Sequence, residues 1–309
     1  MNPTLSIIIL SFNTKNILRD CIESIIKNDK RLDFSGKKID SNNEQLMPAE
    51  LIVVDNGSKD GSVEYLKSLK QGKISNLKLI FNKKNLGFGR ANNQAMKNSG
   101  GEYILLLNSD TIIFDASISQ TLYWLSTHPE YDLVGCRLLN SDKTVQGSVA
   151  DFPHLKTAFT MLFLDRISRK KTMYSPEKIC YVDWIMGAFM LLRRDVYRQT
   201  NGFDENFFMY MEEVEWCYRI HQSGLKIGFY PNARIIHLGG KSSTSRTGPI
   251  VSIYNGLVYF YKKHEKPYQL LILRVMLYIK AAGSYLIGFF KNDDYLKQTY
   301  RQAMAVAKK

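Results

Sequence analysis

The sequence predicts an α/β fold in which a mostly parallel sheet is flanked by helices and followed by a C-terminal helical extension. Three observations support this prediction. Short apolar runs alternate with helical patterns through the first half of the chain, which is typical of βαβ units with parallel strands. These apolar runs end in polar residues, as expected where parallel strands meet a ligand at one edge. Residues 251–309 lose the alternation and become apolar and basic.

The expected elements follow one another along the chain. In the first half, the pattern predicts strands near 5–10, 51–55, 77–81 and 103–107 and helices near 15–28, 60–70 and 87–98. In the second half, it predicts a strand at 188–192, helices near 194–200 and 212–223, and a strand at 225–230. Residues 30–43 are polar and aperiodic, which indicates an exposed loop inserted before the second strand.

Composition limits the class of protein. The chain has 309 residues and a net charge of +13, so it can bury a full core and favours an anionic partner such as nucleotide phosphates, nucleic acid or an acidic membrane face. Residues 251–309 hold ten Lys or Arg against three acids, which indicates a local contact surface. Nucleic acid is the least favoured partner and is not expected, because no recognition motif accompanies the charge.

The cellular setting follows from cysteine usage and the first residues. Four cysteines without C-x-x-C spacing favour a reduced compartment. The N-terminus runs into the first apolar stretch with no basic leader or cleavage site, so a cytoplasmic protein is expected. No P-loop, nucleophile elbow or H-E-x-x-H occurs, and Asn92 occupies the third glycine position of a dinucleotide-binding fingerprint, which excludes those site types.

Three glutamates form the densest acidic cluster. Glu212, Glu213 and Glu215 fall on about one helical turn, where like charges repel and each raises the pKa of its neighbours. A raised pKa makes a carboxylate a usable general base. The alternative is a solvated acidic helix start, which the helix dipole also favours.

Asp110 is the candidate metal ligand among the strand ends. It follows the apolar run 103–107 through Asn108 and Ser109, and oxygen ligands of this kind suit Mg²⁺ or Mn²⁺ bridging to substrate phosphates. The alternative is a turn aspartate that bonds its own backbone.

Five segments in order resemble the family 2 inverting glycosyltransferases. They are residues 6–13, 54–62, 85–93, 108–110 and 184–242. The resemblance covers roughly residues 4–245 and is closest to the bacterial rhamnosyltransferase-like branch that builds surface polysaccharide. It implies a GT-A fold, with a Rossmann-like sheet in a catalytic domain over 1–250. Within that domain, residues 1–112 would bind the nucleotide and residues 113–250 the acceptor.

The resemblance also implies a donor site and a Mn²⁺ or Mg²⁺ site. Asp55 would hydrogen-bond a pyrimidine base, and Asp110 and the late His237 would bind the metal. Asn108 departs from the acid expected at the first D-x-D position, so its contact with the metal stays open. The implied nucleotide-sugar-binding residues are Ser11, Phe12, Asn13, Asp55, Asn56, Gly57, Ser58, Asn85, Arg90, Asn108, Ser109 and Asp110.

For the reaction, the resemblance implies that Glu213 is the catalytic base. Most members of the family have Asp at this position, so the extra methylene is a departure that requires the backbone to compensate, because misplacement by about 1 Å can cost about 100-fold in rate. The implied acceptor-side residues are Trp184, Gly187, Asp204 and Glu212.

These residues predict a metal-dependent inverting glycosyltransferase. The expected donor is dTDP-rhamnose or a UDP-hexose, and the expected acceptor is a glycan or polyprenyl-linked glycan used for cell-surface polysaccharide. The alternative is a catalytically silent nucleotide-sugar-binding or scaffold protein, suggested by the departures at Asn108 and Glu213.

The extension, residues 251–309, is expected to lie at an anionic membrane surface. Its apolar stretch 268–290 contains Arg274 and Lys280, each costing about 3 kcal/mol at a bilayer centre, so a spanning helix is disfavoured. A narrow polar stripe on a wide apolar helix suits peripheral binding at the cytoplasmic face of the inner membrane. The alternative is a helix packed on the catalytic domain.

Overall fold

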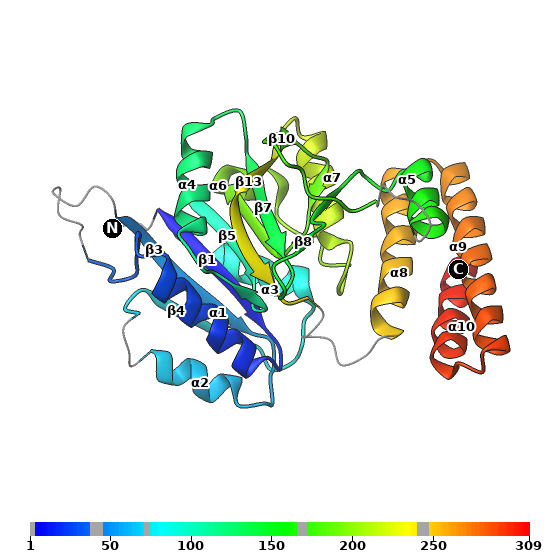
Figure 1. Ribbon diagram of the computed structural model, residues 1–309, viewed down its shortest axis with the longest axis horizontal. Coiled ribbons are helices and arrows are strands. Elements are labelled where there is room, and N and C mark those ends of the chain that lie inside the picture. The colour runs from blue at the N-terminus through cyan, green and yellow to red at the C-terminus, as the bar shows by residue number, and fades with distance from the viewer. Residues whose placement is uncertain (1–3, 38–45, 71–73, 166–171, 240–246) are drawn as a thin grey trace.

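The structure is a computed structural model that describes residues 4–37, 46–70, 74–165, 172–239 and 247–309. Residues 38–43 of the expected loop and residues 240–242 of the 184–242 segment lie outside the described residues. The described part of the expected loop is not wholly exposed, because it contains the short strand β2 (Leu32–Asp33) and the buried Leu32 and Phe34. Figure 1 shows a layered α/β body at the N-terminal side and a group of helices at the C-terminal side.

The expected α/β fold with a mostly parallel sheet is confirmed. In the described residues the main sheet has 11 strands. Among the long strands, β12 runs antiparallel to its two neighbours and the other pairs are parallel, while the short β6, β8 and β10 pair antiparallel. The long strands, in spatial order, are β4 (Leu77–Phe81), β3 (Met47–Asp55), β1 (Leu5–Ser11), β5 (Tyr103–Asn108), β12 (Phe189–Arg193), β7 (Leu133–Leu139) and β13 (Ile227–His237).

Short strands extend the sheet at its margins. These are β2 (Leu32–Asp33), β6 (Thr111–Ile112), β8 (Val145–Gln146) and β10 (Cys180–Tyr181), while β9 (Val149–Ala150) and β11 (Trp184–Ile185) form a separate pair.

Helices cover both faces of the sheet, because strand side chains alternate between two apolar cores. Ile7 and Ile9 of β1 face one core and Ile8 faces the other. The first core is covered by α1 (Lys15–Asn28), α2 (Ser62–Leu69) and α4 (Ser117–Thr127). The second is covered by α3 (Phe88–Asn98), α6 (Arg194–Thr200) and α7 (Glu212–Gln222).

The elements predicted up to residue 107 are confirmed to within a few residues, but the prediction beyond residue 107 is incomplete. The pattern missed α4 and β7, and the strand expected at 225–230 runs on to His237. Pro231 lies where the pairing of β13 with β7 shifts register, between Tyr230 and Arg234. Because proline has no amide hydrogen to donate to a neighbouring strand, Pro231 suggested the end of the strand in the sequence. In the structure the strand continues past an irregularity in its pairing.

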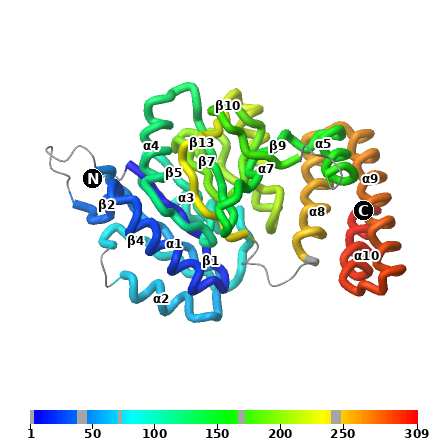
Figure 2. Tube along the Cα trace, in the orientation of Figure 1, coloured from blue at the N-terminus to red at the C-terminus, as the bar shows by residue number. Residues whose placement is uncertain are grey.

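The helical extension consists of α8 (Thr247–His264), α9 (Pro267–Phe290) and α10 (Asp294–Lys308). These helices share a third core, which also takes in the short α5 (Leu155–Phe159) and the π-helical turn η1 (Thr160–Leu164). Figure 2 shows α8 between the α/β body and the pair α9 and α10. The helical extension is thus present as predicted, with α8 nearest to the rest of the fold.

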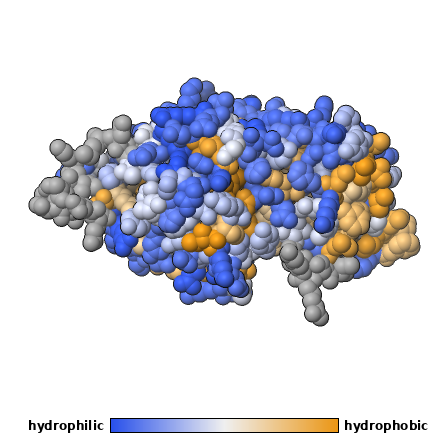
Figure 3. Space-filling model, turned by 90° about the horizontal axis from the view of Figure 1, so that it is seen from above, coloured by the Kyte–Doolittle hydropathy of each residue, from blue (hydrophilic) through white to orange (hydrophobic). Residues whose placement is uncertain are grey.

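Helix α9 leaves most of its apolar surface uncovered. It is long and apolar enough to cross a membrane, with a mean hydropathy of 1.7 over its best window, of which only 17% is buried. Figure 3 shows apolar surface gathered at the end of the molecule that carries the helical extension. Its largest exposed apolar side chains are Leu271, Val275, Ile279, Leu286, Phe289 and Phe290.

Candidate active site

Asp55 ends β3 with one carboxylate oxygen bonded and the other free. The side chain is buried, and its Oδ1 accepts hydrogen bonds from the backbone amides of Gly57 at 3.1 Å and Ser58 at 2.9 Å. In the described part of the chain, no donor reaches its buried Oδ2. A buried acceptor without a partner is costly, so this oxygen is suited to a donor group of a ligand.

The turn after β3 is fixed by Asn56, which binds the segment in front of α3. Its Nδ2 donates to Asn85 Oδ1 at 2.8 Å, and its Oδ1 accepts from the amide of Leu86 at 3.1 Å. Gly57 has φ +88°, and a Cβ there would lie 2.8 Å from Lys84 Cα. Only glycine allows the two segments to approach so closely.

The ends of β1 and β5 meet the same turn. Asn13 donates its backbone amide to Ser58 Oγ at 2.8 Å, and Phe12 beside it is 36% exposed. Ser11 Oγ lies 3.0 Å from Thr14 Oγ1, which also lies 3.5 Å from Ser109 Oγ. The structure therefore brings these predicted donor-site residues to one edge of the sheet.

Asp110 and His237, the two residues predicted to bind metal, are adjacent although they lie far apart in sequence. His237 Nε2 is 3.4 Å from Asp110 Oδ1, and both residues are buried. The pairing of β13 with β6 places His237 opposite Thr111, the residue after Asp110. The two potential ligands therefore point into the same space.

The surroundings of His237 suit a metal ligand. Its Nδ1 lies 2.8 Å from Gln146 Oε1, an acceptor that assigns the proton to Nδ1 and leaves the Nε2 lone pair facing Asp110. No cluster of three or more His, Cys, Asp or Glu occurs in the ranges that the structure describes. The remaining ligands would come from water and donor phosphates, as is usual for Mg²⁺.

Glu212 and Glu213 begin α7, and neither forms an ion pair with a residue that the structure describes. The Oε2 atoms of both are buried, and neither has a hydrogen-bond partner among the described residues. Burial first, and then the charge of Glu213, raises the pKa of Glu212 well above its usual value. Burial also raises the pKa of Glu213, although this residue as a whole keeps some exposure. Both are carboxylates that readily hold a proton.

The expectation that all three glutamates raise one another's pKa is wrong for Glu215. Burial alone would raise its pKa, but hydrogen bonds from His264 and Lys263 and the charge of Arg219 lower it. Glu215 is fully buried in an ion-paired network between α7 and α8. Its neighbours in sequence do not determine its charge; its neighbours in space do.

The predicted acceptor-side residues do not all lie together. Gly187 lies beside the pair, since a Cβ built on it would be 3.9 Å from Glu213 Cβ and 3.4 Å from Phe88. Trp184 donates Nε1 to the carbonyl of Asp151 at 3.1 Å. The Asp204 carboxylate instead faces α8, where it accepts from Lys263 at 2.5 Å.

The structure also gives the contacts of Arg90 and Asn108, which the sequence did not predict. Arg90 pairs with Glu205 at 3.0 Å, which joins α3 to the loop before α7. Asn108 is contacted through its backbone carbonyl, to which Thr111 Oγ1 donates at 2.8 Å. Gln146, which orients His237, was not singled out in the sequence. Nothing in the sequence could mark it, because 91 residues separate the two.

Comparison with known proteins supplies a family. The profile of Glycosyl transferase family 2 matches residues 6–200. The chain is 26% identical over 208 residues to N-acetylglucosaminyl-diphospho-decaprenol L-rhamnosyltransferase of Mycobacterium tuberculosis, which covers 62% of this chain and 66% of that protein. It is 31% identical over 164 residues to the rhamnosyltransferase WbbL of Escherichia coli K12, which covers 49% and 60%. The chain thus spans less than two-thirds of the length of these relatives.

A solved structure agrees with the fold. The mannosyltransferase PcManGT of Pyrobaculum calidifontis, in complex with GDP-Man and Mn²⁺, matches with a TM-score of 0.57 at 14% identity. The match covers 100% of this chain and 86% of that protein. The expected GT-A type of fold is confirmed by this likeness.

Proposed function

The chain belongs to glycosyl transferase family 2, and from that premise we propose that it transfers a sugar from a nucleoside diphosphate sugar to a hydroxyl of a glycan or lipid-linked glycan. The anomeric centre is inverted in a single displacement. The observation that carries this proposal is the buried Glu212–Glu213 pair, whose Oε2 atoms have no partner among the described residues and whose pKa values are raised. Glu213 lies beside Gly187, and the next residue, Ala188, accepts from the amide of Asn108 at the end of β5 at 3.1 Å.

Glu213 is the proposed base. Its carboxylate takes the proton of the acceptor hydroxyl while that oxygen bonds to the anomeric carbon, and the bond from this carbon to the diphosphate oxygen breaks. A carboxylate whose pKa is raised toward neutrality is a more effective proton acceptor. Glu212 supports it, because a like charge nearby favours proton uptake by the pair.

The donor site is proposed at the strand ends. Asp55 Oδ2 accepts the ring N–H of a uracil or thymine base, and Asn56, Gly57 and Ser58 form the turn that presents this oxygen. Phe12 offers an exposed ring beside the base. Rhamnosyltransferase names among the relatives favour dTDP-rhamnose over a UDP-hexose.

The metal site is proposed at Asp110 and His237. Mn²⁺ or Mg²⁺, when bound, supplies positive charge to the leaving diphosphate. Asp110 Oδ1 and His237 Nε2 would hold it, and the hydrogen bond between Gln146 and His237 would keep the ring in the required orientation.

The acceptor is proposed to be lipid-linked, with the protein at the cytoplasmic membrane surface. A decaprenol-linked acceptor is named for one relative, and α9 exposes a wide apolar face in an extension rich in Lys and Arg. Apolar burial together with attraction to anionic lipid gives peripheral binding.

Thermal unfolding with Mn²⁺ or Mg²⁺ and each of dTDP, UDP and GDP tests the donor site. Ligand at about 100 times its Kd adds about 2.7 kcal/mol to the folded state. We expect metal-dependent stabilisation by dTDP or UDP and turnover of dTDP-rhamnose or UDP-glucose with a glycan acceptor. Stabilisation without turnover would instead show a silent binding protein, and no stabilisation by any nucleotide would reject the donor site.

Sedimentation with lipid vesicles tests the membrane proposal. We expect binding to phosphatidylglycerol vesicles, weak binding to phosphatidylcholine, and release by alkaline carbonate. Leu271→Ser with Phe290→Ser should weaken binding at least about tenfold, because each side chain contributes about 2 kcal/mol on burial. Tyr123→Ser on α4 removes an exposed aromatic elsewhere and should change nothing. Retention after carbonate would indicate a spanning helix instead.

A further inference from the structure

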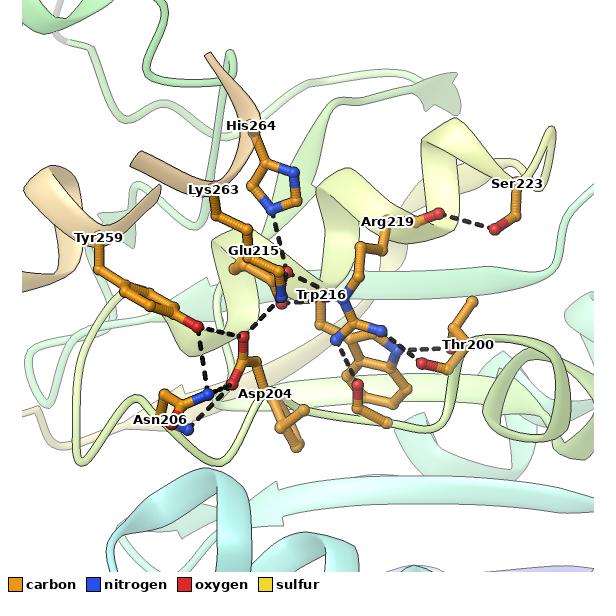
Figure 4. A network of polar contacts seen from close by, with 12 residues as sticks. Thr200, Asp204, Asn206, Glu215, Trp216, Arg219, Ser223, Tyr259, Lys263 and His264 are labelled. Carbon is orange, nitrogen blue, oxygen red and sulfur yellow. Dashed lines mark hydrogen bonds and ion pairs between the residues drawn. The ribbon is translucent and has the colours of Figure 1, made fainter. Parts of the chain in front are cut away.

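A buried ion-paired network joins α7 to α8 (Figure 4). Its centre is Glu215, which is fully buried and accepts from Arg219 Nε at 2.9 Å, Lys263 Nζ at 2.8 Å and His264 Nε2 at 3.0 Å. Arg219 belongs to α7, whereas Lys263 and His264 end α8. The last turn of α8 is thus tied to the helix that carries Glu212 and Glu213.

The same turn of α8 also holds the loop before α7. Lys263 Nζ reaches Asp204 Oδ2 at 2.5 Å, and Tyr259 donates its hydroxyl to the same oxygen at 3.0 Å. Asp204 in turn accepts from the backbone amide of Asn206 at 2.9 Å. Lys263 therefore bridges two carboxylates, one at the start of the loop and one on α7, and it lowers the pKa of Asp204 to about 2 against the effect of burial.

About two turns before Lys263 on α8, Gly256 lies against the residues that immediately precede the Glu212–Glu213 pair. Tyr210 and Met211 have φ values of +70° and +75°, a strained conformation that persists only where the surroundings enforce it. A Cβ on Gly256 would lie 2.7 Å from Met211 Cβ and 3.2 Å from the Tyr210 carbonyl oxygen. Glycine is needed there for α8 to approach the strained turn.

The opposite side of this loop rests on the start of α3. The amide of Phe88 donates to the carbonyl of Phe208 at 2.9 Å, and the backbone of Gly87 allows this approach. The loop 204–211 is thus enclosed between α3, which adjoins the proposed donor site, and α8. Its conformation cannot change without breaking contacts on both sides.

We propose that α8 is a positioning element of the active site. It keeps the carboxylate of Glu213 in place through Lys263 and Gly256. This inference rests on the proposed role of Glu213 as base. Neither residue touches the reacting atoms. Both act through the loop 204–211 and the first turn of α7, and a displacement of about 1 Å there costs about 100-fold in rate.

Five variants of the full chain test this proposal. Lys263→Met removes the bridge and Lys263→Arg keeps its charge, while Lys262→Met changes the exposed neighbour on the same helix. Gly256→Ala introduces the clash, and Gly248→Ala adds a Cβ to the same helix where it meets nothing within 4 Å. Hydrogen exchange of residues 204–215 and steady-state kinetics with dTDP-rhamnose or UDP-glucose are measured for each.

We expect Lys263→Met and Gly256→Ala to speed amide exchange in 204–215 and to lower kcat about 10- to 100-fold, with the KM for the donor within about twofold. Lys263→Arg should restore most of kcat, and the two controls should match the wild type. Wild-type exchange in both test variants overturns the proposal, as does faster exchange with unchanged kcat. Hydrogen exchange is measured independently of turnover. If the wild type transfers no sugar but the two test variants exchange faster, the proposed function is rejected, while the dependence of the loop 204–211 on α8 is established.

Discussion

Helix α7 uses its three glutamates in two different ways. Glu212 and Glu213 keep buried Oε2 atoms that no donor reaches among the described residues, and burial raises their pKa. Glu215, only two residues after Glu213, is held by Arg219 and by Lys263 and His264 of α8, and its pKa is lowered. The Glu212–Glu213 pair is thus left without side-chain partners among the described residues, whereas Glu215 is paired by the protein itself.

The comparison teaches that the role of an acid depends on its tertiary partners. An uncompensated buried carboxylate costs stability, and natural proteins retain such groups mainly where chemistry requires them. A fully paired buried carboxylate instead fixes the arrangement of the elements it joins. The same residue type therefore has a structural role at Glu215 and a proposed role in the reaction at Glu212 and Glu213.

The largest expected effect is on activity, from Glu213→Gln. Loss of the base should lower kcat about 100- to 10,000-fold. The thermal midpoint should stay at or above that of the wild type, because one of two like buried charges is removed, and the stabilisation by dTDP or UDP should be unchanged. Kinetics with dTDP-rhamnose and UDP-glucose check this. A variant with full activity would move the base elsewhere and remove the functional contrast between Glu213 and Glu215.

Glu215→Gln should act on stability. Without the Glu215 charge, Arg219 loses its carboxylate partner, while Lys263 keeps Asp204. The expected cost is about 1–3 kcal/mol of unfolding free energy. Urea unfolding measures it, with Glu205→Gln as the control because Glu205 is 47% exposed in its pair with Arg90. Equal stability in both variants would show that the network contributes little.

The proposed metal ligands, Asp110 and His237, extend the comparison to a second pair of buried side chains suited to a ligand. Gln146→Ala removes the acceptor that orients His237 and should weaken Mn²⁺ binding about 10- to 100-fold, measured by thermal shift against metal concentration. Gln302→Ala, at an exposed position of α10, should bind as the wild type does. Unchanged affinity in Gln146→Ala would indicate that His237 does not bind the metal.

Glu212→Gln should stabilise the folded protein. It removes one of two like charges at a buried position, so the unfolding free energy at neutral pH should rise by about 1 kcal/mol. Denaturant unfolding without metal or nucleotide is the measurement. A loss of stability would mean that Glu212 is compensated by an interaction in the folded state.

The two kinds of carboxylate should also give opposite responses to pH. Glu212 has a raised folded pKa, so stability is highest below its usual value of 4.5 and falls as pH rises through the folded pKa. Asp204 has a folded pKa of about 2, so its contribution is present above the usual value of 3.8 and is lost as pH falls toward 2. That contribution is about 1 kcal/mol, because solvent partly screens the pair with Lys263.

Unfolding at a series of pH values separates the two. The gain from Glu212→Gln should increase from pH 4 to pH 8, whereas the loss from Asp204→Asn should be constant over that range and shrink only in acid. Parallel curves for the two variants would contradict the assignment of their pKa shifts.

Much of the first half was determined by the sequence alone. Apolar runs and helical periods located β1, β3, β4 and β5 and the helices between them, because each element buries a face that its own residues specify. Polar residues after each strand indicated the binding edge, since parallel strands end together. The resemblance supplied the pairing of Asp110 with His237, which the register of β13 with β6 makes physically close.

The tertiary structure alone decided the partners. Gln146 behind His237, Lys263 between Asp204 and Glu215, and Gly256 against Met211 are contacts between residues far apart in the chain. Periodicity reports which face of an element is buried, but it does not report what lies opposite that face. The charge states of the three glutamates depend on that second fact, because desolvation and ion pairing act through space and not along the chain.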